Sequence, residues 1–89
     1  MRSAVGDRSN RVGVDFLQID SQVALTFSGI ALKTSDPEKK NRTTRTARRA
    51  HDAIVRLRTD IELNQVETDK LEANLQRLKS ELQRLGESF

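Results

Sequence analysis

Five arginines are spaced so that one face of a helix could carry them all. Within the run KKNRTTRTARRA, residues 39 to 50, six of the twelve side chains are cationic. A row of guanidinium groups on one helix face can bind phosphate oxygens, because each neutralised phosphate releases counterions. The candidate residues for contact with an anion or a partner are Arg42, Arg45, Arg48, Arg49 and Arg56.

The same residues have a simpler interpretation as the solvated side of a helix. Asp52 lies one turn from both Arg48 and Arg56 and can pair with either. No aromatic residue alternates with the arginines to stack on bases, and no base-reading motif is present. We therefore expect a solvated or internally paired face first, with acidic protein, anionic lipid and nucleic acid as the alternative contacts.

His51 is the single histidine of the chain and precedes Asp52. A histidine and an acidic residue on a helix before a hairpin resemble the phospho-accepting helix of bacterial histidine kinases. The Arg-Thr-Pro that belongs directly after that pair is absent, and the nearest equivalent is Arg58-Thr59-Asp60. We expect His51 to pack at the edge of an apolar helix face.

Other patterns that carry chemistry are missing. Asp15 and Asp20 are five residues apart, so on a helix they point in different directions. No second histidine and no cysteine can complete a metal site, and no glycine-rich phosphate loop or nucleophile elbow is found. We expect no enzymatic activity, no cofactor, no metal and no small-molecule substrate.

The composition predicts one small domain with a thin core. The chain has 89 residues, 35% of them hydrophobic, with three Phe and neither Trp nor Tyr, so aliphatic side chains supply nearly all the burial. A protein partner or self-association could supply more. The absence of cysteine, of a signal-peptide pattern after Met1 and of an apolar run long enough to span a membrane favours a cytoplasmic location.

The helices that would position these residues follow from apolar spacing and from cap signals. Residues 1–11 have no apolar periodicity, which predicts a disordered leader before a helical domain at 12–89. A first helix at about 14–34 carries Phe16, Ile19, Val23, Phe27 and Ile30 at intervals of three and four. Asp20 is either its N-cap or a residue on its apolar face.

The second and third helices have clearer ends. Asp36 followed by Pro37 predicts the start of a helix at 37–58, whose apolar stripe is Ala47, Ala50, Ile54 and Leu57. A leucine seam, consisting of Leu71, Leu75, Leu78, Leu82 and Leu85, predicts a helix at 65–85. Gly86 stands where a C-cap glycine belongs.

Two arrangements of this C-terminal half remain open. The spacing of three and four continues from Ala47 to Leu85, which would fit one helix of about 73 Å in a dimeric coiled coil. Alternatively Asn64 and Glu67 form a capping box after a turn, giving a helical hairpin. The hairpin would place residues 33–58, with nine cations and three acids, beside residues 59–89, with four cations and seven acids. We favour the hairpin for that reason.

Residues 24–57, ALTFSGIALKTSDPEKKNRTTRTARRAHDAIVRL, resemble the helix, Asp-Pro loop and alanine-rich helix of tetratricopeptide-like helical pairs. They also resemble short uncharacterised bacterial helical proteins with a DPEK turn. The tetratricopeptide signature residues Trp, Gly and Tyr are missing, and no 34-residue repeat recurs. The resemblance implies a pair of packed helices and no activity.

Together these features predict an all-α three-helix bundle with a C-terminal helical hairpin. The function that we expect is non-catalytic protein interaction or scaffolding, with nucleic-acid binding through the second helix as the alternative. Phe16, Val23, Phe27, Leu71, Leu75, Leu78 and Leu82 are the predicted packing seam.

Overall fold

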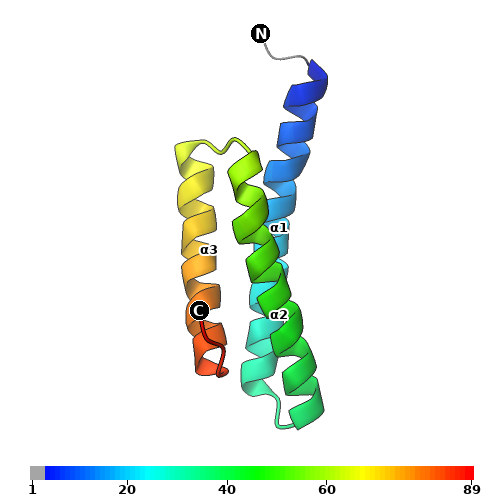
Figure 1. Ribbon diagram of the computed structural model, residues 1–89, viewed down its shortest axis with the longest axis vertical. Coiled ribbons are helices and arrows are strands. Elements are labelled where there is room, and N and C mark those ends of the chain that lie inside the picture. Colours follow the sequence, from blue (N-terminus) through cyan, green and yellow to red (C-terminus); the bar gives the residue numbers. More distant parts are fainter. Residues whose placement is uncertain (1–3) are drawn as a thin grey trace.

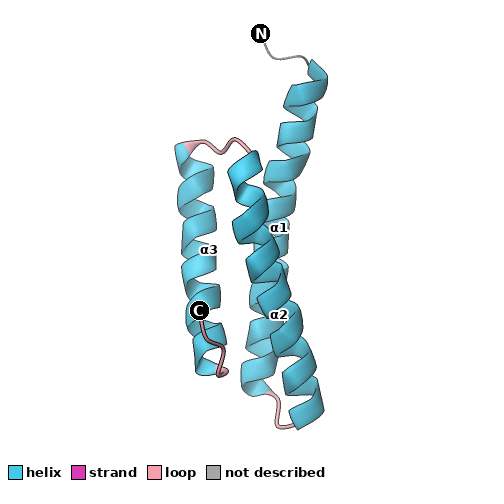
Figure 2. Ribbon diagram, viewed as in Figure 1, coloured by secondary structure: helices cyan, strands magenta, loops and turns pink. Residues whose placement is uncertain are grey.

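The protein is a bundle of three helices joined by short connections (Figure 1). The computed structural model describes residues 4–89, with side chains from residue 9 onward. The helices are α1 (Ala4–Lys33), α2 (Pro37–Leu57) and α3 (Gln65–Arg84), and a 3-10 turn, η1 (Arg58–Asp60), follows α2. This described part of the chain contains no strand (Figure 2). The predicted all-α class and three-helix bundle are confirmed.

A turn separates α2 from α3, so the predicted hairpin is confirmed and the continuous helix is wrong. After η1, Ile61 adopts an extended backbone with φ −122° and ψ 130°. Asn64 then caps α3: its Oδ1 accepts from the backbone N–H of Glu67 at 2.8 Å, and the Glu67 carboxylate accepts from the Asn64 N–H at 3.0 Å. This capping box satisfies donors that a first helical turn leaves free.

The other predicted helix ends are also present. The Asp36 carboxylate accepts from the backbone N–H of Glu38 at 3.0 Å and of Lys39 at 3.4 Å, and Pro37 begins α2. Gly86 has a φ of 96°, a left-handed conformation that glycine adopts without a side-chain clash. These two signals fix where α2 begins and where α3 ends.

Two apolar clusters along the bundle axis form the core, and each takes residues from all three helices. The first contains Leu17, Ile54, Leu71 and Leu75, and the second contains Ala24, Ala47, Leu78 and Leu82. Helix α1 contacts both α2 and α3 extensively, whereas α2 and α3 contact each other less. Helix α1 is therefore the central element of the fold.

The side of α1 that faces the core is a row of mostly small residues, which we call the inner row. It consists of Val14, Leu17, Ser21, Ala24, Ser28 and Ala31, all of them buried. Ser21 Oγ accepts from Asn74 Nδ2 at 3.0 Å, and Ser28 Oγ donates to the Glu81 carboxylate. The small side chains let α3 approach closely, and the two serines are hydrogen-bonded where they are buried.

Helix α1 begins earlier than the sequence predicted. The structure is helical from Ala4, so most of the expected leader at 1–11 belongs to α1, and only positions 1–3 lie outside the described residues. Asn10 exchanges two hydrogen bonds with the backbone of Glu62, of 3.0 and 2.8 Å, and Arg11 pairs with Glu67 at 2.9 Å. These contacts hold a polar segment that has no apolar periodicity. The early start also places Asp20 inside α1, so it is not an N-cap.

Opposite charges meet where the basic and acidic halves of the hairpin face each other. Arg58 at the end of α2 pairs with Glu72 of α3, and Arg48 of α2 pairs with Glu87 at 3.3 Å. The charge asymmetry of the sequence thus supports the hairpin. Within residues 4–89 no helix combines the length and the apolar character needed to cross a membrane.

Candidate partner-binding surface

Helix α1 carries a second apolar row on its outward side, which we call the outer stripe. It consists of Val12, Phe16, Ile19 and Val23, whose residues are 69%, 47%, 62% and 43% exposed. Their intervals of four, three and four residues place them on one face over about three turns. A contiguous set of this kind is more informative than single exposed apolar residues, which are common on protein surfaces.

The outer stripe corrects the predicted packing seam. Leu71, Leu75, Leu78 and Leu82 are buried as expected. Phe16 and Val23 instead lie outside the core, and Phe27 is only partly buried against the second cluster. The physical reason is the inner row: its serines and alanines let the helices pack closer than large side chains would allow, so the larger residues point outward.

Helix α2 presents a cationic row to solvent, which we call the outer arginines. Arg42, Arg45, Arg49 and Arg56 are exposed, and none has a hydrogen bond or an ion pair within the described part of the chain. Arg42, Arg45 and Arg49 line an open surface hollow of about 500 Å³, together with Glu38, Asn41 and Thr46. Four of the five predicted arginines are therefore free to contact another molecule.

Arg48 differs from the other four because it is already engaged. Its Nε donates to the Asp52 carboxylate at 3.1 Å, and its Nη1 donates to the Glu87 carboxylate at 3.3 Å and to the Ser88 carbonyl at 2.7 Å. The guanidinium carbon also lies 3.9 Å from the centroid of the Phe89 ring. Arg48 thus ties the C-terminal residues to α2 and does not belong to the free surface.

His51 is buried beside these groups, at the edge of the apolar face of α2 as expected. Its Nδ1 donates to Asp52 Oδ1 at 3.0 Å, and its ring packs edge-on against Phe89 with centroids 4.8 Å apart. Burial raises the pKa of Asp52, but the hydrogen bonds from His51 and Arg48 and the charge of Arg48 outweigh it, so the pKa lies below the ordinary value. These contacts give His51 a structural role.

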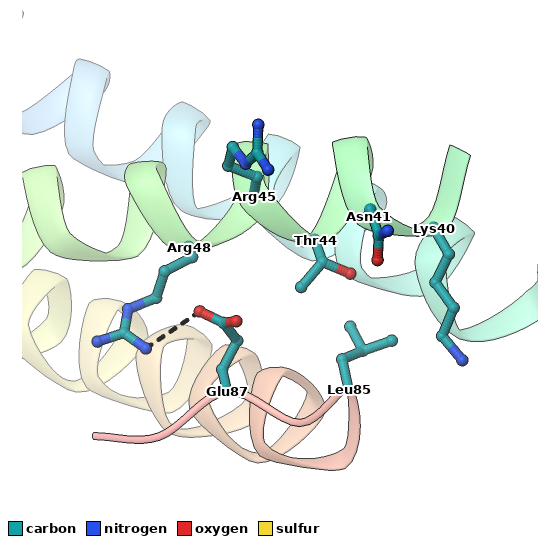
Figure 3. A pocket seen from close by; sticks show the side chains of 7 residues that line it. All are labelled: Lys40, Asn41, Thr44, Arg45, Arg48, Leu85 and Glu87. Atoms are coloured by element: carbon teal, nitrogen blue, oxygen red, sulfur yellow. Dashed lines mark hydrogen bonds and ion pairs between the residues drawn. The ribbon is translucent and has the colours of Figure 1, made fainter. Parts of the chain in front are cut away.

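The hollow beside Arg48 contains one of the chain's own carboxylates. Its volume is about 330 Å³, and it is lined by Lys40, Asn41, Thr44, Arg45, Arg48, Leu85 and Glu87. In Figure 3 the Glu87 side chain projects toward Arg48, whereas Arg45 points away from Glu87. In the described part of the chain no group of three or more His, Asp or Glu side chains could hold a metal ion.

The outer stripe and the outer arginines both face away from α3. Helix α1 bonds to α3 through Arg11, Gln18, Ser21 and Ser28, and the outer stripe lies nearly opposite these residues on the helix. On α2 the residues that reach α3 or the C-terminal segment are Arg48, His51 and Arg58, and the outer arginines are again nearly opposite. Both sets of residues therefore point away from α3.

The register between α1 and α2 determines which residues of the outer stripe and which outer arginines lie at the same height along the bundle axis. The two helices run antiparallel, with Leu17 beside Ile54 in one cluster and Ala24 beside Ala47 in the other. Arg49 is therefore level with Val23, and Arg56 is level with Phe16. We call Arg49 and Arg56, which lie at the height of the outer stripe, the bordering arginines, while Arg42 and Arg45 lie beyond the Val23 end of the stripe.

Comparison of the chain with protein-family models, with curated proteins and with solved structures gives no match.

Proposed function

We propose that this chain is a non-catalytic protein-interaction module and that the outer stripe of α1 is its contact surface. The observation that carries the proposal is the exposure of four apolar side chains at helical spacing on α1, while Leu71, Leu75, Leu78 and Leu82 of α3 are buried. Complete burial of an aliphatic or aromatic side chain contributes about 1.5–3 kcal/mol. Contact with a partner would recover free energy that the isolated fold leaves unused.

The mechanism of this contact is helix-to-helix packing. Intervals of four, three and four residues match the seam that two packed helices share. The outer arginines would steer an approaching partner, because exposed like charges raise the association rate for an oppositely charged surface. The lack of cysteine favours the cytoplasm as the place where this contact forms.

The experiment selects helical peptides from a displayed library against the wild-type chain and measures their affinity by calorimetry. Ile19→Lys should weaken binding at least about tenfold, because it places a charge in the apolar contact. The control is Val66→Lys, since Val66 is 70% exposed on α3 and outside the outer stripe. Equal affinities for the two variants would show that the outer stripe is not the contact surface.

A second candidate function is nucleic-acid binding through the outer arginines. It is supported by the four guanidinium groups without partners in the described residues. Binding of labelled DNA and RNA, measured by fluorescence polarisation, should then be strong at about 50 mM salt and fall steeply as salt rises. Affinity too weak to measure at that salt, or insensitive to it, would exclude this candidate.

A further inference from the structure

We propose that the outer stripe and its bordering arginines bind one acidic amphipathic helix of a partner protein, which completes a four-helix arrangement. This inference rests on the proposed interaction function and adds the chemical class of the partner. It combines two observations: the apolar side chains of the outer stripe are exposed, and the arginines at the same height on α2 lack partners in the described residues.

The shape of the apolar surface favours a helix as the occupant. From Val12 to Val23 the outer stripe extends about 16 Å along α1. Ala53, half-buried on α2 at the level of this stripe, is small and leaves room beside it. A partner helix of about three turns with apolar residues at intervals of three and four can pack its seam on these side chains.

The charge of the border favours an acidic partner. Arg49 and Arg56 are level with the two ends of the outer stripe and are exposed. Asp52, the acid between them on α2, already accepts hydrogen bonds from Arg48 and His51. Carboxylates on the edge of a docked helix would supply the charge-assisted hydrogen bonds that these guanidinium groups lack.

A second copy of this chain is a less suitable occupant of the outer stripe than an acidic helix. A two-fold symmetric contact in which the two copies of α1 pack antiparallel through the outer stripe would bring the cationic border of each copy toward that of the other. Helix α3 of a second copy cannot serve as the occupant in its folded state, because Leu71, Leu75, Leu78 and Leu82 are buried in the core. Charge therefore favours a different protein over self-association.

A lipid surface also fits less well. Asp15 and Asp20 lie on α1 to either side of the outer stripe. Insertion of the stripe into an anionic bilayer would bring both carboxylates toward lipid phosphates. A partner helix can instead place its acids near Arg49 and Arg56 and uncharged side chains near Asp15 and Asp20.

The fold already contains one example of the proposed contact. Helix α3 packs on the opposite flank of the α1 and α2 pair through its leucine seam. Along the edges of that seam, Glu67 accepts from Arg11 and Glu72 pairs with Arg58. A helix with an apolar seam and carboxylates along its edges is therefore the chemistry that this helix pair accommodates within its own chain.

The test uses three synthetic three-heptad peptides and the full chain. The first has a leucine seam flanked by glutamates, the second has the same seam flanked by lysines, and the third has the glutamates but serines in the seam. We expect the acidic leucine peptide to bind, measured by calorimetry at low salt, and the lysine and serine peptides to bind at least about tenfold more weakly.

Charge-reversal variants then test whether Arg49 and Arg56 contact the bound peptide. The double variant Arg49→Glu, Arg56→Glu should lose at least about tenfold in affinity for the acidic peptide and gain affinity for the lysine peptide. Lys70→Glu, Arg84→Glu is the matched control, because it changes the net charge equally at exposed positions of α3. Circular dichroism of both double variants checks that the fold is retained.

The outcomes separate this inference from the proposed function. Binding that Ile19→Lys abolishes but that is equal for the acidic and lysine peptides would overturn the acidic partner and leave the interaction module intact. The inference would also fall if sedimentation equilibrium gave a dimer that Ile19→Lys dissociates, or if only vesicles containing phosphatidylserine bound the outer stripe. Absence of any binding sensitive to Ile19→Lys would remove both proposals.

Discussion

The Arg48 guanidinium lies over the ring of Phe89, with its central carbon 3.9 Å from the ring centroid. The same ring meets His51 edge-on, and the Lys79 ammonium lies 5.4 Å from its centroid. One aromatic side chain beyond α3 is thus held by two cations and a histidine. This cluster joins the C-terminal residues to α2 at a position that the leucine seam does not reach.

Phe89→Ala should lower the free energy of unfolding by about 0.5–1 kcal/mol. The ring is 47% exposed, and a cation–π contact at an exposed site contributes about that much. Urea denaturation followed by circular dichroism gives the value. Ser88→Ala is the control, because Arg48 bonds to the Ser88 carbonyl, which that substitution keeps. An unchanged midpoint for Phe89→Ala would show that the ring contributes nothing to stability.

The contribution of Asp52 to stability should disappear in acid. Hydrogen bonds from His51 and Arg48 hold its pKa below the ordinary value in the folded state despite the opposing effect of burial. The unfolded chain therefore takes up the proton at a higher pH than the folded chain. The stabilisation is complete above about pH 4 and is lost as pH falls through the folded pKa.

The measurement compares the wild type with Asp52→Asn, using urea midpoints at about pH 7 and about pH 3. The wild type should be the more stable protein at the higher pH, and the difference should shrink at the lower one. The comparison cancels the titration of the other carboxylates, which both proteins share. A difference that is independent of pH would show that the Asp52 charge does not stabilise the fold.

Core and surface substitutions should differ sharply in their effect on the free energy of unfolding. Leu78→Ala removes a fully buried side chain and should cost about 2–5 kcal/mol of unfolding free energy. Arg45→Glu combined with Arg49→Glu should change it by less than about 0.5 kcal/mol per site, because both arginines are exposed and unpaired in the described chain. Thermal and urea unfolding provide the measurement. Unfolding by the arginine variant would mean that these residues support the bundle.

Two of the glycines within α1, Gly13 and Gly29, should respond differently to alanine. An added Cβ at Gly29 meets nothing within 4 Å, so Gly29→Ala should stabilise the helix by about 0.5–1 kcal/mol. At Gly13 the new atom would lie 2.8 Å from Ile61 Cδ1, and the isoleucine would have to move. Gly13→Ala should therefore gain less, and differential scanning calorimetry of the pair tests the order. A larger gain at Gly13 would contradict the tight contact with Ile61.

The helix ends of the hairpin could be predicted because their signals are local. Asp36 with Pro37, Asn64 with Glu67, and Gly86 each act within one turn of the chain, and the structure uses all of them. A capping signal also decided between two patterns with the same apolar spacing. The choice between hairpin and continuous helix therefore depended on polar residues.

The core side of α1 could not be predicted from hydrophobicity. Ser21 and Ser28 interrupt the inner row as polar residues, yet they are fully buried, and Asn74 and Glu81 of α3 satisfy them. The larger apolar residues of the outer stripe gave the stronger periodic signal. Partners more than fifty positions away made the serines suitable for the core, and a local pattern does not contain that information.

The contacts of the two ends were missed for a related reason. Asn10 bonds to the backbone of Glu62, and Phe89 packs on Arg48 and His51. Neither end has an apolar repeat, so no sequence signal indicated these contacts. Of the candidate surface, the sequence identified the arginines and the apolar spacing of Phe16, Ile19 and Val23, but neither Val12 nor the outward direction of the outer stripe.

Because the inner row of small residues packs the core, α1 has separate faces for folding and for surface exposure. In α1 the side chains that hold the fold together and those available for recognition occupy different faces and share no positions. Substitutions that change the side chains of the outer stripe can therefore accumulate without lowering the free energy of unfolding. Under the proposed function, the partner specificity of the outer stripe could change during evolution while the architecture stayed constant.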